Sequence, residues 1–128
     1  MTDHIHQIVQ QLIGLLPEID DRKLDFLLGQ IQTGPAAAKS AQRGYDFVHR
    51  LGYDQVQLRA LLEQQILTPG LIDRVIDIRT NQFGGPILNV RSSIQGPTGL
   101  TARLLSSWEV TIRCLRLVTA WVELDRPI

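Results

Sequence analysis

The sequence predicts an all-α protein, in which five short amphipathic helices form a compact bundle around a long apolar helix at the C-terminal end. Two observations carry this prediction. Apolar residues recur at helical spacing through most of the first 80 residues, and residues 100–124 are apolar on nearly every side when wound as a helix. One alternative stays open: an α+β fold with a small antiparallel sheet from about residue 87 onward.

Residues 100–124 decide between these two folds. At about 100° per residue, the polar side chains of this segment fall on one narrow stripe. They are Ser106, Glu109, Arg113, Arg116, Thr119 and Glu123. A strand is favoured by the period-two alternation from Trp108 to Cys114, but the alternation fails at Leu115 and no turn signal follows before Pro127. We therefore favour a helix at the centre of a bundle or in a subunit interface.

Two amphipathic helices are expected at the start of the chain. Residues 3–16 place an apolar face opposite a polar one, and Pro17 ends that helix. The second helix begins near Asp20 or Asp21, where a carboxylate can accept free backbone N–H groups, and it ends at Thr33-Gly34-Pro35.

Three further helices are expected before residue 81. The third runs from Pro35 to Gly52, and its small residues would let a neighbouring helix approach closely. The fourth begins at Asp54, because Asp54 with Gln57 three residues later forms a capping box. The fifth begins at Thr68-Pro69, with proline at the first helical position, and continues to about residue 80.

Residues 81–99 form a connection that is rich in glycine and proline. Within it, Ile87 to Val90 is apolar enough to pack or to form a short strand. There is no internal repeat and no shift in composition that would mark a second domain, so residues 1–128 are expected to fold as a single domain.

Composition restricts the function classes. The chain of 128 residues has 13 basic and 13 acidic residues, which gives no electrostatic footprint for nucleic acid or for an anionic membrane. A membrane span is excluded because Arg113 and Arg116 would lie in the middle of the bilayer. Cys114 is the single cysteine, and the N-terminus lacks a secretion signal, so a cytoplasmic location is expected.

A glycine-containing turn before the expected last helix is the sharpest candidate for a ligand site. Backbone N–H groups at such a turn can hold an anion, and nearby arginines can complete the site. The residues concerned are Arg91, Gly96, Gly99, Thr101 and Arg103. Their spacing matches neither phosphate-binding glycine motif, and ordinary turn and capping chemistry explains the same residues.

No catalytic residue, metal site or cofactor is predicted. His4 and His6 lie two positions apart, so on a helix they point in different directions, and no partner lies at ligand spacing. His49 would need a nucleophile brought to it by the fold before it could act as a general base.

The leading functional hypothesis is a non-catalytic protein–protein interaction or adaptor module that self-associates through its C-terminal helix. The expected partner is therefore a second copy of this chain, or else another protein. The apolar surface of the last helix exceeds what a five-helix shell can cover, and Val110, Leu117 and Trp121 are its predicted interface residues. The first alternative is a domain that senses a small anionic ligand through residues 84–103. A DNA-binding regulator or a small enzyme is a further alternative, although no nucleic-acid partner is expected.

Overall fold

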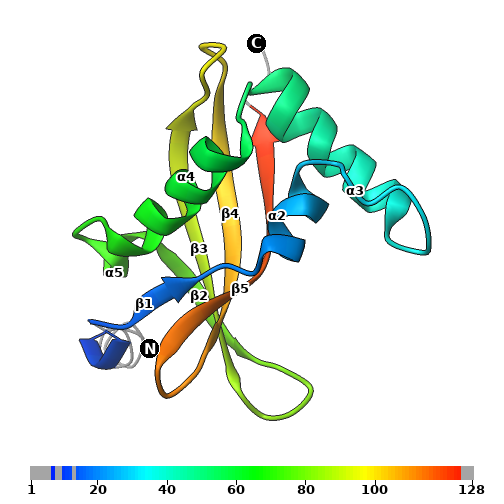
Figure 1. The fold of residues 1–128 in the computed structure, drawn as a ribbon. Coiled ribbons are helices and arrows are strands. Elements are labelled where there is room, and N and C mark those ends of the chain that lie inside the picture. Colours follow the sequence, from blue (N-terminus) through cyan, green and yellow to red (C-terminus); the bar gives the residue numbers. More distant parts are fainter. Residues whose placement is uncertain (1–6, 8–9, 13, 125–128) are drawn as a thin grey trace.

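The computed structural model describes residue 7, residues 10–12 and residues 14–124, and it shows a mixed α+β protein (Figure 1). Helices occupy the first part of the chain and strands the second. The helices are α2 (Asp21–Leu27), α3 (Ala37–Gly44), the π-helix η1 (Tyr45–Arg50), α4 (Gln55–Leu67) and α5 (Leu71–Arg74). The strands are β1 (Leu16–Glu18), β2 (Val75–Thr80), β3 (Pro86–Gln95), β4 (Thr101–Val110) and β5 (Cys114–Leu124).

The strands form one five-stranded sheet in the order β1-β5-β4-β3-β2. Strands β2 to β5 make an antiparallel meander, and β1 joins the outer edge of β5 in parallel. Figure 1 shows α4 crossing over the sheet, with α2 beside β5 and α3 further to the side. The predicted all-α bundle is therefore wrong, and the α+β alternative describes the outline of the fold.

The predicted long helix at residues 100–124 is the hairpin of β4 and β5. The β4–β5 turn contains no glycine or proline. Every described residue with a positive φ is a glycine, so this turn is built without a positive φ. Thr111 supplies the turn chemistry instead: its N–H donates to the Cys114 carbonyl, and its hydroxyl accepts the Arg113 and Cys114 N–H groups at 3.2 and 2.9 Å. Ile112 lies at the tip of the turn and is 95% exposed.

A β-bulge explains why the alternation in this segment fails. Ser107 pairs with Thr119, but Trp108 pairs with Leu117, so Val118 is an extra residue in β5. A shift of one residue moves every later side chain to the other face of the sheet. As a result Leu115, Leu117 and Ala120 all point into the core, so the spacing of buried residues changes from two to three in the middle of β5.

The predicted extent of the fifth helix is wrong, and the short strand allowed for at Ile87 to Val90 is present as part of a longer strand. The fifth helix starts after Gly70, which has a φ of 88°, and it ends at Arg74, where the chain continues directly as strand β2. The connection at 81–99 contains the ten residues of β3 between two turns. The β-branched residues of β2 fit a strand better than a helix, and here that preference prevails over the helical spacing of the apolar residues.

The predicted starts of the second and fourth helices are confirmed. The Asp20 side chain accepts the Arg22 N–H at 2.8 Å, and Asp54 and Gln57 form the complete capping box. The predicted third helix is continuous as α3 followed by η1. Of the predicted first helix, residues 10–12 are helical and Leu16 begins β1, while residues 1–6, 8–9 and 13 lie outside the described chain.

We expect Asp54→Ala to lower the free energy of unfolding by about 1 kcal/mol, because the Gln57 N–H loses the carboxylate that accepts it at 2.7 Å. Thermal melts followed by circular dichroism would measure the change. Gln55→Ala, at an exposed position one residue later, is the matched control and should leave the melting temperature close to that of the parent protein. Equal melting temperatures for all three proteins would contradict the role of the cap.

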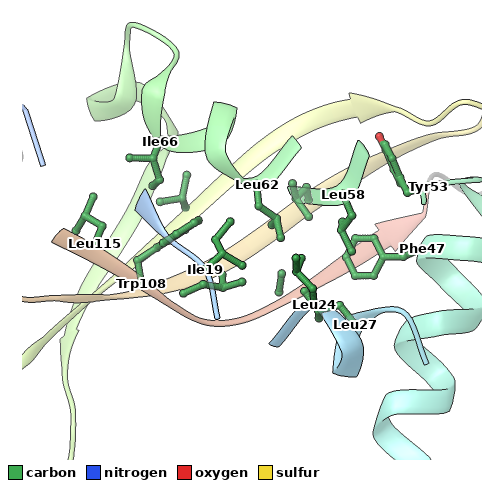
Figure 2. Close-up of a cluster of buried hydrophobic side chains, with 14 of the residues drawn as sticks. Ile19, Leu24, Leu27, Phe47, Tyr53, Leu58, Leu62, Ile66, Trp108 and Leu115 are labelled. Atoms are coloured by element: carbon green, nitrogen blue, oxygen red, sulfur yellow. The ribbon is translucent and has the colours of Figure 1, made fainter. Parts of the chain in front are cut away.

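One hydrophobic core lies between the helices and the sheet (Figure 2). Phe47, Leu58, Leu62 and Trp108 are fully buried there, so side chains from η1, α4 and β4 meet in the same layer. The helices thus cover one face of the sheet and leave the other face to solvent. None of the helices in the described residues is long and apolar enough to span a bilayer.

Candidate functional site

The face of the sheet that carries no helix is the candidate functional surface, and we call it the open face. Cross-strand pairing arranges its side chains in rows that run across the sheet. In order, the rows are Arg79, Ile87, Glu109 and Arg116; then Asp77, Asn89, Ser107 and Thr119; then Arg91, Leu105 and Trp121; then Ser93, Arg103 and Glu123.

A groove of about 520 Å³ lies on the open face. The extra residue of each bulged strand contributes to it, since both Ile76 of β2 and Val118 of β5 line its wall. Leu105 and Trp121 line the groove together with the second row, Asp77, Asn89, Ser107 and Thr119, which we call the polar row. A hollow of this size that is open to solvent can receive a side chain or a small molecule.

The polar row of the groove is a chain of hydrogen bonds across three strands. The Ser107 hydroxyl donates to the Asn89 Oδ1 at 2.5 Å, and the Asn89 Nδ2 donates to the Asp77 carboxylate at 2.5 Å. The Arg79 Nε binds the other oxygen of Asp77 at 3.2 Å. Asp77, Asn89 and Ser107 are each held by a neighbour, so these three side chains form an ordered pattern of charges and dipoles.

Apolar side chains lie in the middle of the open face and ion pairs lie around them. Leu105 is 7% exposed beneath its cross-strand neighbour Trp121, which is half-buried. On one side the Arg116 and Glu109 side chains approach to 3.2 Å, and on the other side Arg103 and Glu123 approach to 3.5 Å. An apolar centre with a charged, solvated rim is the arrangement found in protein–protein interfaces.

The structure does not assemble the predicted anion site. The turn at Gly96 and Gly99 joins two strands and does not begin a helix. Its N–H groups are already used, since Gly96 donates to the Leu100 carbonyl, Gly99 to the Gly96 carbonyl and Thr98 to the Leu51 carbonyl. The turn therefore packs against the end of η1 and offers no cluster of free backbone donors to an anion.

The arginines predicted for that site lie elsewhere. Arg91 and Arg103 are diagonal neighbours on the open face, and Arg103 forms the ion pair with Glu123. Thr101 begins β4 and pairs with Gln95 at the end of β3. Of the five predicted anion-binding residues, Arg91, Arg103 and Thr101 thus lie on the open face, and none of the five lines the groove.

The three predicted interface residues are divided between the two faces of the sheet. Leu117 is 1% exposed in the core, and Val110 packs against that core. Trp121 lies on the open face and lines the groove. The surface that we expected on one helix does not exist, but Trp121 is still available to a partner.

Titratable groups that suit catalysis or metal binding do not gather at the groove. No three His, Cys, Asp or Glu side chains in the described part of the chain are placed to share a metal ion. Burial raises the pKa of the Tyr53 phenol, which lies in the core on the other face of the sheet. Cys114 is a free thiol at the β4–β5 turn, 3.3 Å from the Glu18 carboxylate.

Sequence reasoning missed the polar row and the groove. The residues concerned are Asp77, Asn89 and Ser107, which come from three strands that the helical interpretation did not contain. The available signal was the alternation in β3, where the apolar Leu88 and Val90 point inward and the polar Asn89 and Arg91 follow them. That signal is short, and it supported no more than a short strand from Ile87 to Val90 within the connection at 81–99.

Comparisons with known proteins find a similar fold. No known protein family and no curated protein matches the sequence. Among solved structures, the fold is similar to a chain in the contact-dependent growth inhibition toxin–immunity protein complex from Klebsiella pneumoniae 342. The TM-score is 0.64 and the sequence identity is 22%, and the match covers 82% of this chain and 98% of that chain. At this level of identity the likeness concerns the fold.

Proposed function

We propose that this protein is a non-catalytic binding protein that holds a different protein against its open face. The observation that carries the proposal is the arrangement of that face, in which Leu105 and Trp121 form an apolar centre between two ion pairs. The likeness to a chain from a toxin–immunity complex supports it, because that fold occurs in a protein bound to a dissimilar partner.

The chemistry of the groove supports binding over catalysis. Ser107 is a hydroxyl in the groove that is linked to the Asp77 carboxylate through Asn89, and it donates its proton to the amide oxygen of Asn89. An amide oxygen is too weak a base to activate a serine, and Asp77 is occupied by Asn89 and Arg79. We therefore assign these groups to recognition, where they present fixed donors and acceptors to a partner.

A site-specific cross-linking experiment tests the proposal. A photoreactive amino acid would replace Arg91 on the open face, and a control would carry it at Val56, which is 78% exposed on α4. We expect cells that express the first variant to yield one discrete cross-linked protein. That protein would be identified by mass spectrometry, purified and combined with the parent chain. Equal cross-linking from Val56, or no binding between the purified proteins, would overturn the proposal.

Trp121→Ala should weaken that reconstituted complex by about 2 kcal/mol, or roughly 30-fold in the dissociation constant, because a half-buried tryptophan at the centre of an interface commonly anchors binding. Isothermal titration calorimetry would measure the affinity. Val56→Ala is the matched control and should bind as the parent protein does. A loss of melting temperature with unchanged affinity would instead make Trp121 a residue of folding alone.

Expression of the chain in a bacterial host without its partner tests the non-catalytic part of the proposal separately. We expect growth to continue at the rate of cells that carry the empty vector. Growth arrest by the parent chain that the partner protein relieves would identify it as the active member of a pair, and it would contradict a purely binding role.

A further inference from the structure

Strand β2 ends the sheet without a neighbour on its outer side in the described chain. The opposite end of the sheet is closed differently. There β1 pairs with β5 over three residues, and further along β5 the Arg43 Nε donates to the Ala120 carbonyl at 3.0 Å. An edge strand without such cover presents backbone N–H and C=O groups that can pair with another strand.

The register of the hairpin tells which groups of β2 point outward. The Asn81 N–H donates to the Gly85 carbonyl at the turn, so the hydrogen-bonded pairs of the ladder continue at Arg79 and Asp77. In an antiparallel ladder the residues between such pairs direct their N–H and C=O groups away from the partner strand. Ile78 and Thr80 therefore present their backbone groups to the free edge.

The sequence of this edge is complementary to itself. If two β2 strands are laid antiparallel about a twofold axis through Ile78, Asp77 of each copy faces Arg79 of the other. The outward backbone groups of the two Ile78 residues then bond mutually. Asp77 and Arg79 form a non-hydrogen-bonded cross-strand pair, the kind in which side chains come closest.

We propose that two copies of this chain associate through their β2 edges and join two five-stranded sheets into one sheet of ten strands. The two open faces then form one continuous surface, since Asp77 and Arg79 belong to the open face of each copy. This association uses the backbone of the sheet edge, whereas the partner protein proposed above is centred on Trp121, and Asp77 and Arg79 lie where the edge meets the groove.

The charge pattern favours a second copy over an unrelated strand. A partner of different sequence would need its own opposite charges in the same register, whereas this chain supplies both. The bulge between Val75 and Asp77 interrupts the strand and restricts regular pairing to its second half. The interface is therefore short, and we expect association to depend on protein concentration.

Charge reversal tests this register directly. Asp77→Arg places two arginines opposite each other across the axis, and Arg79→Asp places two aspartates there. We expect sedimentation velocity at several concentrations to show a reversible dimer for the parent chain. Each single variant should have a dissociation constant at least about tenfold higher, because like charges directly opposite are destabilising.

A mixture of the two variants distinguishes lost pairing from lost folding. In a heterodimer of Asp77→Arg with Arg79→Asp, each arginine again faces an aspartate, so we expect the mixed sample to dimerise while each variant alone stays monomeric. Thr80→Pro removes an outward N–H and should also weaken the dimer. A parent chain that stays monomeric at every concentration, or a mixture no more associated than its components, would overturn the proposal.

Discussion

Gly44→Ala should destabilise the protein by about 3 kcal/mol, which is the cost of forcing an atom into a closely packed site. A Cβ at position 44 would lie 2.6 Å from the Gly29 Cα and 2.8 Å from the Leu28 carbonyl oxygen. Both are backbone atoms, so no side chain can turn away to make room. Ser40 of α3 also holds α2 in place, because its hydroxyl donates to the Phe26 carbonyl at 2.8 Å.

The expected loss of stability is opposite in sign to the usual effect of replacing a helical glycine by alanine. Gly44 is the last residue of α3 and has helical dihedral angles, and at an unobstructed helical position alanine is more stable than glycine by about 1 kcal/mol. Thermal melts should show a fall in melting temperature of roughly 10 °C or more. Lys39→Ala, at an exposed position on the same helix, is the control and should change little. A rise for Gly44→Ala would mean that α2 and α3 are not in contact there.

The first half of the fold could be predicted because its signals are local. Asp20 and Asp54 cap helices with their own side chains within three residues, and Gly52 has the positive φ of 87° that the end of a helix needs. Buried positions of α4 were also predicted correctly, since Leu58, Leu62 and Ile66 are buried in the structure. Such features depend on chain neighbours and not on the rest of the molecule.

The second half could not be predicted for two reasons. Its strands depend on pairing between distant parts of the chain, and its last turn lacks the residues that usually mark a turn. The turn at Thr111 replaces glycine with a hydroxyl, and the bulge at Val118 shifts the alternation of β5 in the middle of the strand. The first change removes the usual signal of a turn, and the second interrupts the period of two that marks a strand. The pairing partner decides the outcome, and the partner lies in another part of the chain.

The open face was beyond prediction for the same reason. Its rows combine residues that are far apart in sequence, such as Asp77 with Asn89 and Ser107, so no spacing in the chain marks them. Trp121 was chosen for its size and chemistry, which do not depend on whether the segment is a helix or a strand. The glycine turn was chosen because a helix was expected to follow it. A strand follows instead, so the prediction of an anion site at this turn has lost its basis.

Ser106→Ala should destabilise the protein by about 3 kcal/mol, because one hydroxyl satisfies two other buried groups. It accepts the Trp108 indole N–H at 2.7 Å and donates to the Gln65 Oε1 at 2.5 Å. Trp108 is fully buried and Gln65 is 4% exposed, so water cannot replace either bond without opening the core. Ser93→Ala, at an exposed position on β3, is the matched control and should stay within about 0.5 kcal/mol of the parent.

A double-mutant cycle separates this network from ordinary packing. Gln65→Leu removes the amide that also donates to the Ser92 hydroxyl and to the Leu104 carbonyl, each at 3.1 Å. Because both changes remove the same bond between Gln65 and Ser106, the double variant should lose less than the sum of the single losses, by about 1 kcal/mol. Urea unfolding followed by near-ultraviolet circular dichroism reports on Trp108 and would give all four free energies. Strict additivity would mean that Ser106 acts on Trp108 alone, and that α4 is held on the sheet by apolar contacts without help from the amide.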